Sequence, residues 1–296
     1  MSKIKISELF YSIQGEGRYM GVPSVFLRTF GCNFTCDGFG MPRGEKSNER
    51  NEVAVNITKY KQYRDLPLVS TGCDSYASWD PRFKDFSPVL TTEAIVERIR
   101  QLLPFKRWTR EHLVITGGEP LLGWQRSYPD LLDHKFMRRL REITFETNGT
   151  QPLTKEFKEY LKDWSAGPKN AYQLSQGFSI PTKHKEITFS VSAKLPCSGE
   201  RWEDAIKPEI VCDYETVGWT YLKFVVANEQ DIYDALTASV AYRDAGFRGE
   251  IYLMPVGGIE SVYSLNNRNV ALECMKYGLR YSDRLQVPLF RNAWGT

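Results

Sequence analysis

Residues 24–36, Ser-Val-Phe-Leu-Arg-Thr-Phe-Gly-Cys-Asn-Phe-Thr-Cys, decide the fold class of this 296-residue chain. Their first half is rich in β-branched and aromatic residues, which favours a strand over residues 24–30. The strand leads directly into Cys32 and Cys36, whose thiolates can turn towards one metal centre. Two cysteines at this spacing are also commonly buried as small apolar residues, so the motif alone leaves both interpretations open.

Short apolar runs of the same kind alternate with helical patterns along the chain. The predicted strands cover residues 4–10, 24–30, 112–116, 143–147, 186–192, 221–227 and 249–254. Apolar residues recur at helical spacing after Thr92, which is the expected N-cap, and again after Thr154. A third helix is expected over residues 262–277, where Gly278 ends it. Strand–helix alternation predicts a mainly parallel sheet with helices outside it. Seven strands in one run favour a single α/β domain over residues 1–296, built as an incomplete (βα) barrel.

The composition excludes several classes of protein. The 39 basic and 36 acidic side chains leave a net charge of +3, too small for a protein that coats nucleic acid. No window approaches the 18 or more apolar residues of a membrane span, and the polar N-terminus lacks a signal-peptide core. We therefore expect a cytoplasmic protein with no membrane or direct nucleic-acid partner, in which the six cysteines stay reduced.

A second motif, Thr116-Gly117-Gly118-Glu119-Pro120, follows the predicted strand 112–116. Its two glycines allow a ligand to approach the backbone, and its carboxylate can receive an ammonium group. A simple strand-ending turn is the alternative interpretation.

Together the two motifs resemble those of radical S-adenosylmethionine (SAM) enzymes. Those enzymes carry a Cys-x3-Cys-x2-Cys loop after the first barrel strand and Gly-Gly-Glu-Pro after the second. The resemblance implies the incomplete barrel of that superfamily and three cysteines holding a [4Fe-4S] cluster. The fourth iron then binds SAM, whose methionine ammonium is held by the Gly-Gly-Glu-Pro segment.

Further motifs occur in the order typical of the 7-carboxy-7-deazaguanine synthase (QueE) family. They are Ser-Ile-Gln-Gly-Glu-Gly at 12–17, Val-Phe-Leu-Arg at 25–28, Glu-Thr-Asn-Gly-Thr at 146–150, Ser-Ala-Lys at 192–194 and Met-Pro at 254–255. The resemblance runs from residue 7 to about 286. It implies a radical SAM carbon–nitrogen lyase that converts 6-carboxy-5,6,7,8-tetrahydropterin to 7-carboxy-7-deazaguanine with loss of ammonia. That reaction belongs to 7-deazapurine biosynthesis, as in queuosine, and needs SAM, the cluster and Mg²⁺.

The sequence departs from the family at the third cysteine. Phe39 stands where the third ligand is expected, and the next cysteine is Cys73. Asp74 and Ser75 follow it, which resembles the Cys-Asp-Thr that closes the family's cluster loop. We therefore interpret residues 37–72, which show no sustained periodicity, as an insertion whose ends lie close together. Cys32, Cys36 and Cys73 are then the cluster ligands, and Ser75 supplies a hydroxyl to Mg²⁺.

The resemblance also assigns the remaining site residues. The expected substrate site consists of Gln14, Gly15, Glu16, Arg28 and Thr116. The expected SAM site consists of Gly72, Asp74, Gly117, Gly118, Glu119, Asn148, Ser192, Lys194, Met254 and Pro255. Glu16 can accept from the N–H groups of the pterin, and Arg28 can pair with its carboxylate. The family often has a Gln-x-His sequence near the C-terminus. In the C-terminal tail of this chain, residues 284–296, Gln286 is followed by Val287 and Pro288, so the histidine is missing.

The resemblance implies two protein partners, an electron donor such as flavodoxin or ferredoxin and a second copy of the chain in a homodimer. Two other functions stay open. A glycyl-radical-enzyme activase shares the cluster motif but requires neither residues 14–16 nor Ser75. A non-catalytic metal-binding or redox interaction protein would show no turnover. Cys197, Cys212 and Cys274 match no motif and are interpreted as structural.

Overall fold

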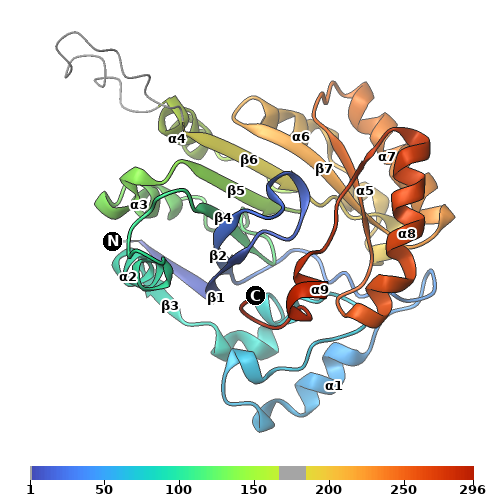
Figure 1. The fold of residues 1–296 in the computed structure, drawn as a ribbon, viewed down its shortest axis with the longest axis horizontal. Helices are drawn as coiled ribbons and strands as arrows, with labels where there is room; N and C mark the ends of the chain where they lie inside the picture. The colour runs from blue at the N-terminus through green and yellow to red at the C-terminus, as the bar shows by residue number, and fades with distance from the viewer. Residues whose placement is uncertain (1, 167–184) are drawn as a thin grey trace.

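One open sheet forms the centre of the molecule in the computed structural model, which describes residues 2–166 and 185–296 (Figure 1). Its strands are β1 (Lys3–Ile13), β2 (Pro23–Thr29), β3 (Val89–Thr91), β4 (His112–Gly117), β5 (Glu142–Thr147), β6 (Glu186–Val191), β7 (Trp219–Val226), β8 (Ile251–Pro255) and β9 (Arg280–Tyr281). They follow the order β3-β1-β2-β4-β5-β6-β7-β8-β9. From β2 to β9 all neighbours are parallel, and only β1 pairs antiparallel, with β2 and β3. The mainly parallel sheet predicted from the sequence is therefore confirmed.

All seven predicted strands are present, and the structure adds β3 and β9. These two strands have three and two residues, too few to show any periodicity in the sequence. The central strands β4 and β6 are buried along most of their length. β4 carries the apolar run 113–115, whereas the apolar residues of β6 alternate with Thr188 and Ser190. Aromatic side chains fill the core between sheet and helices, with Phe189 stacked on Phe145 and on Tyr214 at centroid distances of 5.6 and 4.6 Å.

Helices occur in the connections between strands and after the last strand, and the longest of them pack against the sheet. They are α1 (Glu49–Val55), α2 (Thr92–Leu102), α3 (Tyr128–Leu132), α4 (Lys155–Ala166), α5 (Trp202–Ala205), α6 (Pro208–Glu215), α7 (Glu229–Asp244), α8 (Glu260–Tyr277) and α9 (Gln286–Phe290). The N-cap of α2 is Thr91, whose hydroxyl accepts from the Ala94 N–H, so the expected cap at Thr92 is wrong by one residue. Gly278 ends α8 in the left-handed conformation, as predicted.

The segment between Cys36 and β3 is folded, although the sequence shows no period there. It contains α1 and the 3₁₀ turns η2 (Ile57–Lys59), η3 (Tyr63–Asp65), η4 (Tyr76–Ser78) and η5 (Pro81–Phe86). Its apolar side chains form a small hydrophobic core separate from the main one, comprising Val53, Tyr63, Leu66, Val69, Tyr76, Ala77 and Phe83. Short turns with a shared core give no repeating pattern in the sequence, which explains why they were not predicted.

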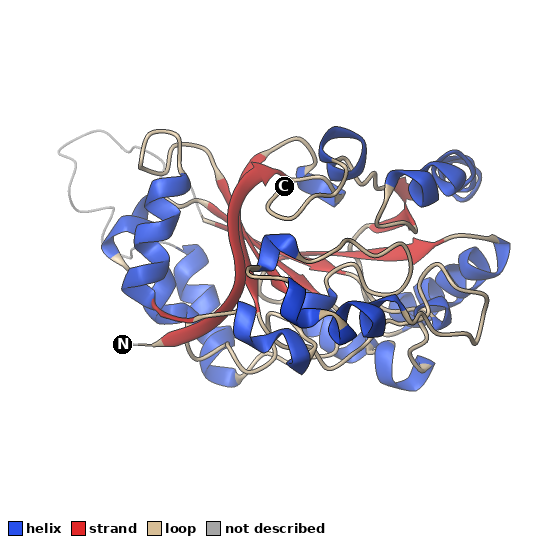
Figure 2. Ribbon diagram, turned by 90° about the horizontal axis from the view of Figure 1, so that it is seen from below, coloured by secondary structure: helices blue, strands red, loops and turns tan. Residues whose placement is uncertain are grey.

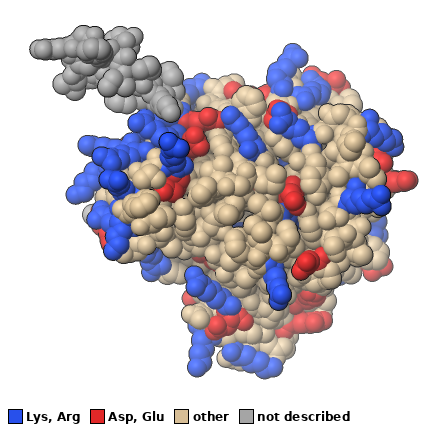
Figure 3. Space-filling view, viewed as in Figure 1, with Lys and Arg blue, Asp and Glu red and all other residues tan. Residues whose placement is uncertain are grey.

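The helices were compared with the length and hydrophobicity of a membrane span. Across the residues that the structure describes, none of the helices has the length and apolar character needed to cross a bilayer. Lys and Arg gather on the side of the molecule around α2 to α4, whereas the middle of the face in Figure 3 carries few charges. Figure 2 shows β1 as a long curved strand that crosses the molecule and leads to the side where the C-terminal residues lie.

Candidate functional site

A cleft opens at the carboxyl ends of the parallel strands, which is where open α/β sheets bind ligands. The expected site residues that line it are Gln14, Gly15, Glu16, Arg28, Cys32, Cys36, Gly72, Cys73, Asp74, Ser75, Thr116, Gly117, Gly118, Asn148, Ser192, Lys194 and Met254. Segments distant in the sequence therefore meet at one place. Glu119 and Pro255 are the expected site residues that do not line the cleft.

Three thiols lie together on the wall of this cleft. Cys32, Cys36 and Cys73 belong to one small apolar cluster with Phe34 and Phe39. Burial raises the pKa of all three thiols, that of Cys32 to about 12. Neighbouring thiols add to the effect at Cys32 and Cys36, and the Asp74 carboxylate adds to it at Cys73. All six cysteines of the chain are free. Burial therefore disfavours the thiolate form of these cysteines. A positively charged metal centre would offset the cost of forming the thiolates, because it binds that form.

The ends of the inserted segment lie side by side. The Gly72 N–H donates to the Phe39 carbonyl at 2.7 Å, and the Ser47 N–H donates to the Asp37 carbonyl at 2.8 Å. Within the described residues, no three His, Cys, Asp or Glu side chains are grouped as a single metal ion requires. A [4Fe-4S] cluster binds each thiolate on a different iron, so its ligands stand further apart. The three thiols fit that larger group in number and chemistry.

The Gly-Gly-Glu segment packs directly against the cysteine loop. A Cβ on Gly118 would lie 2.4 Å from the Gly31 carbonyl oxygen, so no other residue fits there without a shift. The Glu119 N–H donates to that same oxygen at 2.7 Å. The Glu119 carboxylate points into the fold and accepts from the Leu121 N–H, the Thr147 hydroxyl and the Asn148 N–H. Burial outweighs these three donors and raises the pKa of Glu119 to about 7.

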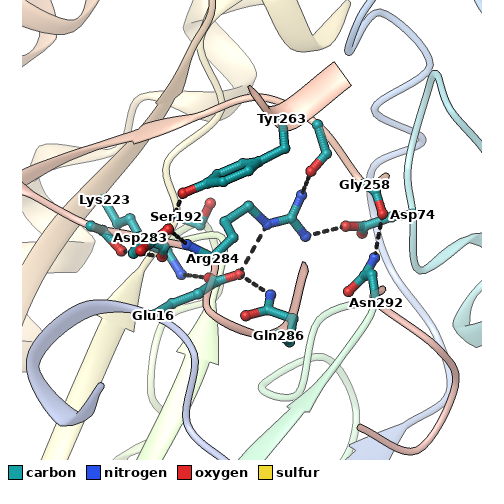
Figure 4. A network of polar contacts seen from close by, with 12 residues as sticks. Glu16, Asp74, Ser192, Lys223, Gly258, Tyr263, Asp283, Arg284, Gln286 and Asn292 are labelled. Carbon is teal, nitrogen blue, oxygen red and sulfur yellow. Dashed lines mark hydrogen bonds and ion pairs between the residues drawn. The ribbon is translucent and has the colours of Figure 1, made fainter. Parts of the chain in front are cut away.

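Glu16 is the centre of a buried network of charges (Figure 4). Its carboxylate pairs with Lys223, accepts from Arg284 Nε at 3.3 Å and accepts from Gln286 Nε2 at 2.8 Å. Burial by itself would raise the pKa of Glu16, but Lys223 and Arg284 outweigh it and hold the pKa at about 2. Arg284 also pairs with Asp74, next to Cys73. The network therefore keeps Glu16 ionised and joins it to the cysteine loop.

Arg28 lies in the cleft wall between Glu8 of β1 and Ser75 of the cysteine loop. Its Nε donates to Glu8 at 3.0 Å, and its Nη1 donates to the Ser75 hydroxyl at 3.1 Å. Ser75 in turn donates to Asp74 Oδ1 at 3.2 Å. The guanidinium is thus fixed in the cleft wall by partners on two different segments.

Two further pairs of side chains fix polar groups in the cleft. Gln14 Nε2 donates to Glu146 Oε1 at 3.0 Å, and Lys194 Nζ donates to Ser192 Oγ at 2.9 Å. These interactions place amide, ammonium and hydroxyl groups of three separate segments in fixed orientations along one cleft.

The sequence interpretation missed Glu8, Lys223 and Arg284. Lys223 is buried in β7 among apolar residues, a placement that is rare for lysine without a partner and that could have marked it. Glu8 occupies a buried position of β1 in the same way. The other cysteines are structural, as expected: Cys274 is buried in the main core, and Cys197 and Cys212 pack against it.

Comparisons with known proteins give a consistent result over nearly the full length. The chain is 29% identical over 295 residues to a 7-carboxy-7-deazaguanine synthase of Halobacterium salinarum, covering 98% of this chain and 91% of the relative. It is 25% identical to a protein of the same name from Pyrobaculum aerophilum, covering 99% and 97%. The crystal structure of QueE from Escherichia coli shares the fold, with a TM-score of 0.52, 20% identity and coverage of 95% and 93%. No family model matches the chain.

Proposed function

This chain belongs to the 7-carboxy-7-deazaguanine synthase family of radical SAM enzymes, and from this premise we propose how its cleft is used. The proposed reaction converts 6-carboxy-5,6,7,8-tetrahydropterin to 7-carboxy-7-deazaguanine with loss of ammonia. The observation that carries the proposal is one cleft that holds three cysteine thiols, the two glycines at the end of β4 and an ionised Glu16.

The cofactor side of the cleft is assigned to its thiols and glycines. Cys32, Cys36 and Cys73 would hold a [4Fe-4S] cluster, and residues 117–118 with Ser192 and Lys194 would hold SAM beside it. When bound, this pair supplies a carbon-centred radical by reductive cleavage of SAM. Glu119 supports this arrangement from behind, since its carboxylate fixes the backbone at Asn148.

The substrate side is assigned to Glu16, Arg28 and Ser75. Glu16 is ionised and can accept hydrogen bonds from the amino and ring N–H groups of a pterin. Arg28 offers a planar guanidinium to the substrate carboxylate. Ser75 supplies a hard hydroxyl oxygen to Mg²⁺, which would clamp that same carboxylate. Fixed charges in a buried cleft orient the substrate carbon without reorganisation during the reaction.

The electron donor and the assembly are part of the same proposal. A small low-potential protein of the flavodoxin or ferredoxin type would deliver the electron, and two copies of the chain would form a homodimer. Both follow from family membership.

The test is anaerobic reconstitution with iron and sulfide, followed by incubation with SAM, a reductant, Mg²⁺ and the carboxy-pterin. We expect a product of the mass of 7-carboxy-7-deazaguanine, together with ammonia and 5′-deoxyadenosine. Formation of 5′-deoxyadenosine only in the presence of a partner protein would indicate an activase instead. A protein that binds iron but never cleaves SAM would contradict the enzyme assignment altogether.

A further inference from the structure

The C-terminal segment is attached to the insertion by one tryptophan. The Trp294 ring meets Tyr63 and Tyr76 edge-on, at centroid distances of 4.9 and 6.1 Å. Its indole Nε1 donates to the Leu66 carbonyl at 2.7 Å. All three partners belong to the small hydrophobic core of the cysteine loop, so Trp294 completes a core whose other members come from residues 53–83.

The residues on either side of Trp294 form part of the cleft wall. Asn292, Ala293, Gly295 and Thr296 all line the cleft. Asn292 Nδ2 donates to the Gly258 carbonyl at 2.8 Å. Asn292 and Trp294 therefore attach this segment to two different parts of the molecule.

The residue after Trp294 reaches the partner of Arg28. Gly295 and Glu8 line the same cleft, and the Gly295 backbone acts to lower the pKa of the Glu8 carboxyl group, so the two groups are neighbours. Glu8 in turn accepts from Arg28 Nε, and Arg28 Nη1 donates to Ser75. Gly295 therefore lies between the docked indole and the carboxylate that holds the Arg28 guanidinium in the cleft.

We propose that Trp294 is a positioning residue, which docks the C-terminal segment on the insertion so that Gly295 fixes Glu8 and thereby Arg28. This inference rests on the proposed function for the identity of the ligand, a pterin carboxylate. The proposal assigns a role to the insertion. Together with Tyr76, which follows it, the insertion supplies the residues that bind the Trp294 ring. The thiols and the Gly-Gly segment do not take part in it.

The test compares Trp294→Ala, Trp294→Phe and the control Leu289→Ala in steady-state kinetics and SAM binding. Leu289 lies on α9 of the same segment and is 52% exposed, so its truncation leaves the cleft intact. For Trp294→Ala we expect the KM for the carboxy-pterin to rise about tenfold or more, because a lost positioning contact weakens the grip on the substrate carboxylate. SAM affinity and iron content should stay at parent values. Trp294→Phe keeps the ring contacts but loses the bond to Leu66, so its KM should be intermediate.

A double variant distinguishes an effect of Trp294 that acts through Arg28 from an effect that is independent of Arg28. If Trp294 acts through Arg28, the effects of Trp294→Ala and Arg28→Lys are not independent, and the double variant is little worse than Arg28→Lys alone. Multiplication of the two effects would overturn the proposal. So would an unchanged KM in Trp294→Ala, or an equal loss of SAM affinity and iron.

Limited proteolysis tests the docking of Trp294 without any need for catalytic activity, so its result does not depend on the proposed function. Trypsin cleavage after the exposed Arg291, followed by intact mass, reports whether the segment is held down. Faster cleavage in Trp294→Ala than in parent and Leu289→Ala is the expected result, and equal rates would contradict the docking. Failure of the parent to convert the pterin would instead contradict the proposed function.

Discussion

At the residue scale, the Lys223 ammonium group is the main reason that the Glu16 carboxylate in the cleft is charged. Lys223 is buried and the Glu16 side chain is only 14% exposed, so bulk water stabilises neither charge well. Each is stable because the other compensates for its lost hydration, and Arg284 with Gln286 satisfies the other carboxylate oxygen. The pKa of Lys223 is raised by Glu16 despite the opposite effect of burial. The pair is therefore ionised throughout the physiological range.

Replacing Lys223 with Met should make pterin binding dependent on pH. With a pKa of about 2, Glu16 in the parent stays ionised down to well below pH 5, so KM should be flat from pH 5 to 8. The variant loses the main charge that opposes desolvation, and the pKa of Glu16 moves upward. KM should then rise as the pH falls, with about 1.4 kcal/mol of differential interaction for each pKa unit. Lys223→Arg is the control that keeps the charge, and an equally flat profile in the Met variant would refute this role.

At the element scale, the loop after β2 and the loop after β4 form one packed unit. Thr29 pairs with Gly117 in the ladder, and the next residues of both strands continue in backbone contact through Gly31 and Glu119. A ligand held by the glycines after β4 is thereby placed beside Cys32. The insertion leaves this unit after Cys36 and returns to it at Gly72, where the chain bonds to Phe39.

Gly118→Ala should disturb both loops at once. The added Cβ would stand 2.4 Å from the Gly31 oxygen and 2.7 Å from the Cys32 Cβ, so the backbone must move. Overpacking of this kind costs about 1–3 kcal/mol of folding free energy. We expect a lower denaturation midpoint and weaker SAM binding. Gly246→Ala serves as a comparison for glycine replacement, since a Cβ there meets no atom within 4 Å although its positive φ still brings strain. Weakened SAM binding in both variants would show that the effect is not local.

Cys73→Ala should abolish stable incorporation of the cluster, because it removes one of three thiols on the cleft wall. Loop-closure entropy grows only with the logarithm of loop length, so the 36 residues between Cys36 and Cys73 are no obstacle to shared ligation. Iron content and visible absorption after reconstitution give the measurement. Cys197→Ala, Cys212→Ala and Cys274→Ala are the matched controls and should keep the cluster. A full cluster in Cys73→Ala would assign the third ligand elsewhere.

At the scale of the whole molecule, one core supports a cleft that needs buried charge. Phe145, Phe189 and Tyr214 lie in a stacked series between the sheet and its helices. Burial of this apolar surface stabilises the fold and offsets the desolvation of the charged groups at the strand ends. Phe145 and Phe189 are followed by Glu146 and Ser190, which line the cleft. Because successive side chains of a strand point to opposite faces, the core and the cleft lie on opposite faces of these strands.

Phe189→Ala should cost about 3–5 kcal/mol of unfolding free energy, as for other large aromatic truncations in cores. Phe189 is fully buried, so the cavity cannot be filled by water without further cost. Urea denaturation with a comparison to Phe105→Ala, at a 69% exposed position, checks the value. A loss below about 1 kcal/mol would mean that the core relaxes around the cavity.

Local patterns in the sequence predicted most of the strands, and most of the expected site residues line one cleft. The strands β1, β2 and β4 to β8 follow from β-branched and aromatic runs, and the end of α8 follows from Gly278. The insertion's turns were missed because they have no period, and the cap of α2 was misplaced by one residue between two adjacent threonines. Glu119 was expected in the cleft because of its motif, but the donors at Leu121, Thr147 and Asn148 turn it inward.

What the sequence determined by itself was the order of short motifs along a strand–helix alternation, because each motif and each period is contained in a few consecutive residues. The tertiary structure decided which single residues join them. Lys223 and Arg284 are 207 and 268 residues away from Glu16, and Trp294 is 228 residues away from Leu66. Such pairs leave no local signal, since a contact across the sheet depends on strand order and register, and only the folded chain fixes both.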